Sequence, residues 1–193
     1  MRKAPPSLGY HEVDYQFLAI LRKSHAAFLQ ARQRESELAK APAVAPAATQ
    51  QLFHATADTK QQGVISVIMA VSYLEATIHN YGTHFIHFKT YEEHLDCLGL
   101  VSKWMVVPML AQGIEIKEDS RELNELKELV KARNCIIHSK IKWMTDDGLK
   151  NMNDEKEIRR FRKAAEKALG TVTGLIQIIE AHQQKVRHQL RRG

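Results

Sequence analysis

Arg133 and His138 are the residues of this chain best suited to chemistry on a phosphate group. Arginine carries a permanent charge on a planar fork that matches the geometry of a phosphate. Histidine exchanges protons near neutral pH, so it can act as a general acid or a general base. The pair therefore raises the question of whether these two side chains can reach one phosphate.

The segment from Ser120 to Ile137 has the spacing of an amphipathic helix, and Arg133 falls on its apolar side. At about 100° per residue, the leucine, valine and isoleucine side chains gather on one arc, with Arg133 near its centre. A lone charge in a dry core is very costly, so Arg133 is predicted to have a partner or to lie at an interface. His138 falls roughly 140° further round if the helix continues. The helix must end or bend near His138, or a second copy must complete the site.

Glu75 is the predicted partner of Arg133. It lies on the apolar arc of a second and more hydrophobic helix, which is expected over Gly63 to Phe88. An ion pair across two packed helices would compensate both charges and would orient the guanidinium group. The alternative is that Glu75 faces solvent at an exposed edge of the protein.

Lys140, Lys142 and Trp143 follow His138 and suit a nucleic acid. Two cations can contact an RNA backbone, and an aromatic ring can stack on a base. The alternative is a tethered loop whose tryptophan packs onto the rest of the protein. Another lysine and tryptophan, Lys103 and Trp104, lie inside an apolar helical pattern and are predicted to be structural.

Four histidines, at positions 79, 84, 87 and 94, are close together in the sequence. His84 and His87 are three residues apart, a spacing that can place two imidazoles on one metal in a helix. However, no His-Glu-x-x-His motif or cysteine pair at ligand spacing accompanies them, and Gly82 could break the helix. We therefore expect ordinary histidines and no metal. The chain also lacks a glycine-rich phosphate loop and paired catalytic carboxylates, so no cofactor is expected.

The composition predicts an all-α protein with one sizeable core. The chain has 193 residues, and its charged and apolar residues recur at three and four positions rather than in alternation. Its net charge of +6, from 28 basic and 22 acidic residues, is compatible with a polyanionic partner or simply with a basic protein. Helices are expected over 11–40, 63–88, 91–97, 101–111, 120–137 and 154–187. An Ala/Pro linker at 41–48 divides the chain into an N-terminal part, 1–48, and a helical bundle with a basic tail, 49–193.

Several features favour a reduced, cytoplasmic protein. Cys97 and Cys135 are the two cysteines, too few for a disulfide framework in a chain of this length. No apolar segment of secretory type is visible within residues 1–10. The most apolar run, Leu98 to Leu110, is too short to span a membrane and is interrupted by a lysine and a proline.

The hexapeptide Arg133-Asn134-Cys135-Ile136-Ile137-His138 resembles the signature of HEPN domains. That signature is an arginine, often followed by asparagine, with four to six residues before a histidine near the end of a helix. The upstream stretch Ala70-Val-Ser-Tyr-Leu-Glu-Ala76 also looks like the first core helix of many such domains. The resemblance covers Gly63 to about Ala181 and leaves out the N-terminal helix and linker.

The resemblance implies a small α-helical bundle that forms a homodimer, with the motifs of two protomers meeting in one cleft. Many such domains are metal-independent endoribonucleases in toxin–antitoxin and other defence systems. By this resemblance His138 would exchange a proton with the RNA, Arg133 would bind the scissile phosphate, and Asn134 would hydrogen-bond the phosphate or fix the motif. An antitoxin or another protein would be a further partner.

Two other functions are compatible with the same residues. The first is a HEPN-like module that binds RNA, a nucleotide or a protein without cleaving anything. The second is a helical scaffold in which Glu75 and Arg133 form a structural ion pair and His138 caps the C-terminus of its helix.

Overall fold

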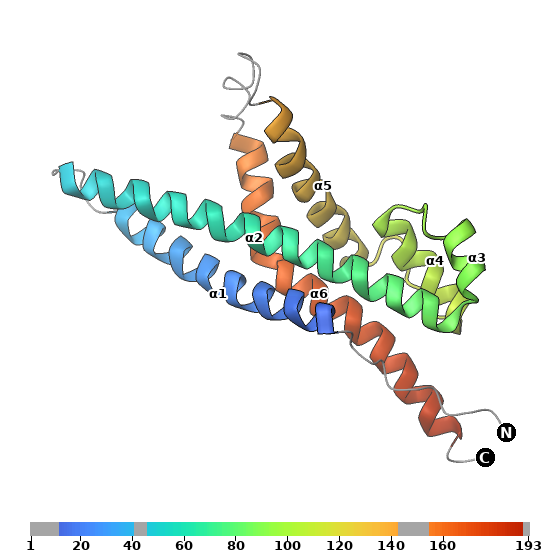
Figure 1. Ribbon diagram of the computed structural model, residues 1–193. Coiled ribbons are helices and arrows are strands. Elements are labelled where there is room, and N and C mark those ends of the chain that lie inside the picture. Colours follow the sequence, from blue (N-terminus) through green and yellow to red (C-terminus); the bar gives the residue numbers. More distant parts are fainter. Residues whose placement is uncertain (1–11, 41–45, 143–154, 191–193) are drawn as a thin grey trace.

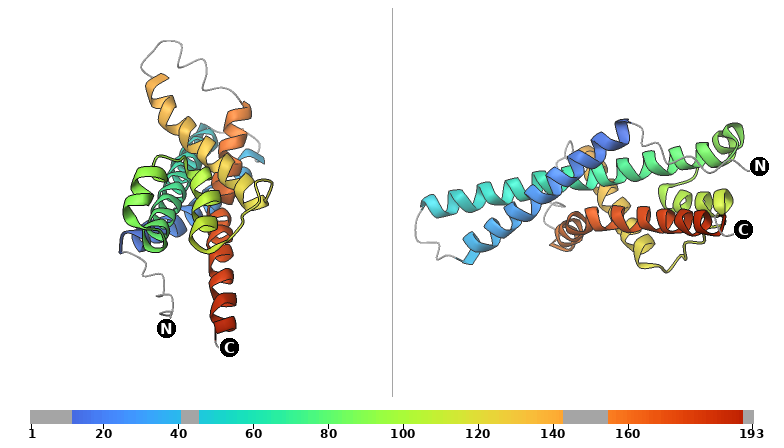
Figure 2. Two further views of the ribbon diagram at one scale, coloured as in Figure 1. Left: turned by 90° about the vertical axis from the view of Figure 1, so that its right-hand side faces the viewer. Right: turned by 90° about the horizontal axis from the view of Figure 1, so that it is seen from below.

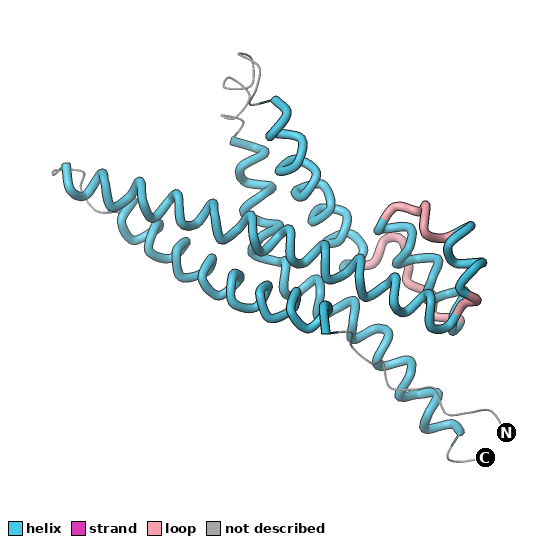
Figure 3. Tube along the Cα trace, in the orientation of Figure 1, coloured by secondary structure: helices cyan, strands magenta, loops and turns pink. Residues whose placement is uncertain are grey.

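Six α-helices make up most of the protein (Figures 1 and 3). The computed structural model describes residues 12–40, 46–142 and 155–190, and these residues contain no β-strand. The prediction of an all-α fold is therefore confirmed. The helices are α1 (Glu12–Lys40), α2 (Pro46–Phe85), α3 (Phe88–His94), α4 (Leu100–Gln112), α5 (Arg121–Lys142) and α6 (Glu155–Leu190).

Helices α1 and α2 lie side by side and antiparallel (Figures 1 and 2). Helix α6 crosses this pair and contacts α1, α2 and α5, while α3 and α4 lie against the C-terminal part of α2. The C-terminal half of α5 and the N-terminal half of α6 rise together from the pair. We call residues 128–142 of α5 and 155–167 of α6 the arm.

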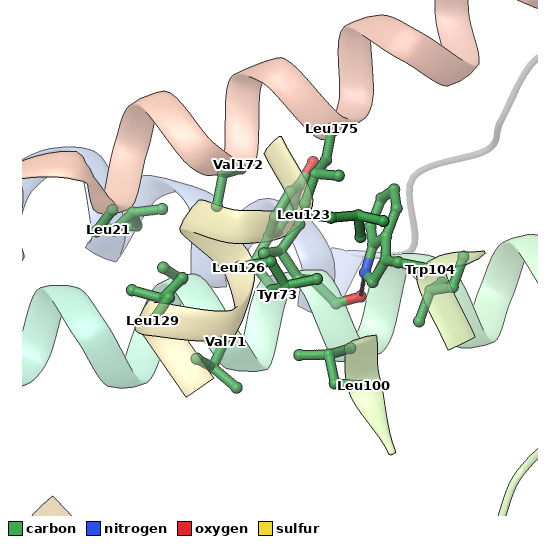
Figure 4. Packing of buried hydrophobic residues seen from close by; sticks show 14 of the residues in the cluster. Leu21, Val71, Tyr73, Leu100, Trp104, Leu123, Leu126, Leu129, Val172 and Leu175 are labelled. Atoms are coloured by element: carbon green, nitrogen blue, oxygen red, sulfur yellow. Dashed lines mark hydrogen bonds between the residues drawn. The ribbon is translucent and has the colours of Figure 1, made fainter. Parts of the chain in front are cut away.

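The hydrophobic core lies where α2, α4, α5 and α6 meet, and α1 closes one side of it (Figure 4). Trp104 of α4 is fully buried, and its indole Nε1–H donates a hydrogen bond of 3.3 Å to the carbonyl oxygen of Leu74 in α2. The prediction that Trp104 is structural is thus confirmed. The other large buried side chains are Leu21, Phe28, Tyr73, Leu74, Ile78, Tyr81, Tyr91, Leu123, Leu126, Leu129 and Leu175.

Helix α2 begins at Pro46, whereas the sequence pattern predicted a start at Gly63. The intervening residues are polar, so no strong periodicity marks them. They are helical because they pack along α1: Ala55 and Thr59 are buried, and the Thr56 hydroxyl donates to a Glu35 carboxylate oxygen at 3.2 Å. Residues 46–48 at the end of the expected linker are therefore helical, and residues 41–45 lie outside the described range.

Gly82 lies within α2 and does not break it, contrary to the sequence-based suggestion. The aromatic ring of Tyr91 in α3 packs directly on Gly82, where a β-carbon would overlap it. The glycine therefore lets the short helix α3 lie close against α2. A second glycine, Gly113, ends α4 in the left-handed conformation at φ 69°, and its N–H donates to the Met109 carbonyl oxygen.

Helix α5 begins as predicted, with Ser120 as its N-cap: the backbone N–H of Leu123 donates to the Ser120 hydroxyl oxygen at 3.3 Å. It continues past the predicted end at Ile137 to Lys142. The bounds of helix α6 agree within a few residues with the range 154–187 predicted from the sequence. Ile158, near the start of α6, is exposed because it lies on the arm beyond the core.

None of the helices in the described residues is long and apolar enough to cross a membrane. Helix α4, which contains most of the apolar run noted in the sequence, has 13 residues. Both cysteines of the chain, Cys97 and Cys135, are free and exposed.

Candidate functional site

Arg133 and Glu75 form the ion pair that the sequence predicted. The guanidinium Nη2 of Arg133 donates to Oε1 of Glu75 at 2.9 Å, which joins α5 to α2. The pair is not buried in the core, however: the Arg133 side chain is 28% exposed and the Glu75 side chain 47%. Both charges lie at the base of the arm, where solvent still reaches them, so neither carries the full cost of burial.

Asn134 holds the other terminal nitrogen of Arg133. The Nη1 group of Arg133 donates to Oδ1 of Asn134 at 3.2 Å. Two of the five N–H donors of the guanidinium group are thus engaged by Glu75 and Asn134. This arrangement fixes the plane of the guanidinium and leaves donors that a phosphate could use.

His138 lies in α5, and the helix continues beyond it for one turn. Its helical position is therefore about 140° around the axis from that of Arg133, and the option that the helix ends at His138 is wrong. The suggested role of His138 as a C-terminal cap is wrong for the same reason. The placement of the His138 side chain lies outside what the structure describes.

Two of the three predicted substrate-binding residues lie at the end of α5. Lys140 and Lys142 belong to the last turn of α5, but their side chains lie outside the described part of the structure. Trp143 lies outside the described residues altogether. Of the predicted site residues, the structure thus brings Arg133, Asn134 and Glu75 into contact, and it does not bring His138 to the same face of α5.

The histidine cluster is engaged in local contacts. His79 Nδ1 lies 3.6 Å from Oδ1 of Asp96, and the His79 ring packs edge-on against Tyr91. Lys103 donates to the same Asp96 oxygen at 2.7 Å, and this hydrogen bond lowers the pKa of Asp96 below its usual value. Among the described residues, no group of three or more His, Cys, Asp or Glu side chains is arranged to share a metal ion.

A second set of charged residues on the arm was not identified from the sequence. Glu128 of α5 accepts a hydrogen bond from Lys131 at 2.8 Å and lies 3.2 Å from the Nε of Arg160 in α6. The hydrogen bond from Lys131 is the main reason that the pKa of Glu128 is lowered, and Lys163 contributes by its charge. The i,i+3 spacing of Glu128 and Lys131 is visible in the sequence, but the contact with α6 depends on how the two helices pack.

No family model matches the chain, and no curated protein or solved structure matches it. The class of the protein is therefore defined by its own fold and site. It is an all-α bundle with a charged two-helix arm, at whose base an arginine is held by a glutamate and an asparagine.

Proposed function

We propose that this protein is a metal-independent endoribonuclease of HEPN type that acts as a homodimer. The observation that carries the proposal is the arrangement of Arg133, which is half-exposed, fixed by two hydrogen bonds, and part of the motif that ends at His138. A catalytic arginine has to be held in place before it meets a phosphate, because orientation contributes much of the rate. Glu75 and Asn134 supply that orientation.

The reaction follows from the residue types. His138 removes the proton from a ribose 2′-OH, and the resulting oxygen attacks the adjacent phosphorus. The bond from phosphorus to the 5′-oxygen breaks, and the leaving 5′-oxygen takes up the proton that His138 removed from the 2′-OH. The products are a 2′,3′-cyclic phosphate and a free 5′-OH. Arg133 stabilises the charge that develops on the phosphate oxygens.

A second protomer would allow Arg133 and His138 to act on one phosphate although they lie on different faces of α5. Because α5 is continuous through His138, the two residues occupy different faces of one helix. In a twofold dimer, Arg133 of one chain and His138 of the other can approach the same phosphate. Exposed isoleucines on the arm, Ile137 and Ile158, provide apolar surface for such a contact.

In this role the protein is a toxin or defence effector of the cytoplasm, restrained by an antitoxin or another protein partner. Lys140, Lys142 and Trp143 would bind the RNA beside the cleavage point. No cofactor enters the reaction, since the proton transfers and the charge stabilisation come from side chains.

The test is cleavage of a single-stranded RNA in the presence of EDTA. The wild type is expected to give products that end in a 2′,3′-cyclic phosphate, and His138→Ala is expected to reduce the rate by about 100-fold or more, the usual range for a general acid or base. Exposed histidines on other helices provide the control: His54→Ala should retain the full rate. Full activity of His138→Ala, or strict dependence on a divalent ion, would contradict the proposal.

A non-catalytic RNA-binding module is the second candidate. It is favoured by the same hydrogen bonds, since Arg133 already has two partners within its own chain and so is stable without a substrate. This candidate predicts that the RNA is bound and recovered intact by wild type and His138→Ala alike.

A further inference from the structure

The arm carries more basic than acidic residues, although Arg133, Arg162 and Lys167 pair with acidic residues outside it. Residues 128–142 and 155–167 contain ten Lys or Arg and four Asp or Glu, a net charge of +6 in 28 residues, which equals the net charge of the whole chain. Such a concentration of one sign on a projecting element creates a local field that attracts polyanions.

Two of these cations pair with a single carboxylate, and a third acts on it through its charge. Lys131 donates to Oε1 of Glu128 at 2.8 Å, Arg160 lies 3.2 Å from Oε2, and Lys163 is close enough to act on the charge of the carboxylate. The group spans both helices of the arm, because Glu128 and Lys131 belong to α5 while Arg160 and Lys163 belong to α6. Among the side chains that the structure describes, one negative charge offsets only one of these three positive charges.

These side chains are accessible. The exposed fractions are 56% for Lys131, 43% for Arg160 and 46% for Glu128, and Lys163 is exposed as well. Ion pairs at such exposure contribute little to stability, so the cations can exchange Glu128 for another anion at small cost. Two other cations of α6, Arg162 and Lys167, do not belong to the group because they pair with Glu35 and Glu125.

The cationic group shares a face of α5 with His138. Positions 131, 134, 138 and 142 follow one another at intervals of three or four residues, so Lys131, Asn134, His138 and Lys142 fall on one stripe of the helix. Lys131 and His138 are about 10 Å apart along the axis. Arg133 lies on the opposite side of α5, towards α2.

We propose that Lys131, Arg160 and Lys163, arranged around Glu128, form a binding surface for the phosphate backbone of single-stranded RNA. This inference rests on the proposed function and names the path of its substrate. The strand follows the outer face of α5 from the cationic group to His138, and Arg133 of the second protomer approaches from the other side. We call these three cations the backbone site.

The test measures binding of a fluorescein-labelled oligouridine of about 12 nucleotides, a length in the range of single-strand sites. Its 2′-O-methyl groups prevent cleavage, so binding is measured alone. The variant Lys131→Gln/Arg160→Gln/Lys163→Gln is compared with Arg22→Gln/Lys23→Gln/Arg34→Gln, which removes the same charge from exposed positions on α1.

Loss of the backbone site should weaken binding about tenfold or more at low salt and lower the slope of log K against log salt by roughly 2, since each phosphate contact contributes about 0.7. The α1 variant should stay within about threefold of wild type. Glu128→Gln should bind several-fold more tightly, because it removes the one anion that competes with the phosphates. Tighter binding is not expected from a residue whose role is only structural.

Equal losses in the two triple variants, no binding by the wild type, or weaker binding by Glu128→Gln would each overturn the inference. The inference would also be overturned if the triple variant lost more of its binding to anionic lipid vesicles than of its binding to RNA. Its failure is distinct from that of the proposed function. If cleavage requires His138 but is unchanged in the triple variant, only the backbone site is refuted. If RNA binding requires the three cations but no cleavage occurs, only the ribonuclease activity is refuted.

Discussion

The two ends of α5 are held in place by different kinds of interaction. Near its start, α5 meets α2, α4 and α6 through fully buried side chains such as Leu123 and Leu126, close to Trp104 (Figure 4). From residue 128 onward it lies in the arm (Figure 1), where buried residues such as Leu129 and Ala132 are accompanied by partly exposed ion pairs. Buried apolar contacts hold the first region, and the second region adds exposed charged pairs to such contacts. Substitutions should therefore mainly change stability near the start of α5 and binding or catalysis at the exposed charges of the arm.

The contact between α2 and α3 gives the largest expected loss of stability. Gly82→Ala places a methyl group against the ring of Tyr91, and overpacking of this kind costs about 1–3 kcal/mol. Urea denaturation monitored by circular dichroism measures the change. Gly170→Ala in α6 is the control, because no atom lies within 4 Å of its β-carbon position. There the better helix propensity of alanine should stabilise by up to about 1 kcal/mol. Equal effects at the two glycines would show that packing on Gly82 is unimportant.

The ion pairs of Glu125 with Arg121 and Lys167 make the stability of the contact between α5 and α6 depend on pH. Burial would raise the pKa of Glu125, but hydrogen bonds from Lys167 and Arg121 outweigh it and lower the pKa below its usual value of 4.5. A carboxylate with a lowered pKa stabilises the fold above the pKa of the unfolded chain, and this stabilisation disappears as the pH falls through the folded value.

Glu125→Gln should therefore destabilise the protein by about 1 kcal/mol at pH 7 and progressively less below pH 4.5, as expected for loss of a charged hydrogen-bond acceptor. Thermal unfolding over this pH range is the measurement. A difference between the two proteins that persists unchanged at pH 3, or one that grows on acidification, would argue against this assignment.

The smallest effect on stability is expected at the base of the arm. Glu75→Gln weakens a half-exposed ion pair with Arg133, and such pairs contribute about 0–1 kcal/mol. The same substitution should lower the rate of RNA cleavage by about tenfold or more, because Arg133 loses the partner that orients it. Chemical denaturation and a cleavage assay on the same preparation separate the two effects. Unchanged stability together with unchanged cleavage would show that the pair has no role.

Periodicity predicted the helices that have a strong apolar face, and it missed the helical residues that are held by a neighbour. Residues 46–62 of α2 carry no clear pattern and are helical through their contact with α1. The pair of Arg133 and Glu75 was predictable, because two charges on apolar arcs of different helices need partners. The exposure of this ion pair was not predictable, since the sequence does not show where α5 leaves the core. Nor could the sequence place Arg160 beside Glu128, because that contact depends on how α5 and α6 pack.

The central claim is that Arg133 of one chain and His138 of another serve one phosphate, and mixing two inactive variants tests it most directly. Arg133→Ala and His138→Ala are unfolded together, refolded at equal concentrations and assayed on single-stranded RNA in EDTA. Half of the dimers that form at random contain one intact pair of residues, so activity should recover to roughly a quarter of that of the wild type. A mixture that stays as inactive as its components, although heterodimers are present, would contradict the shared site.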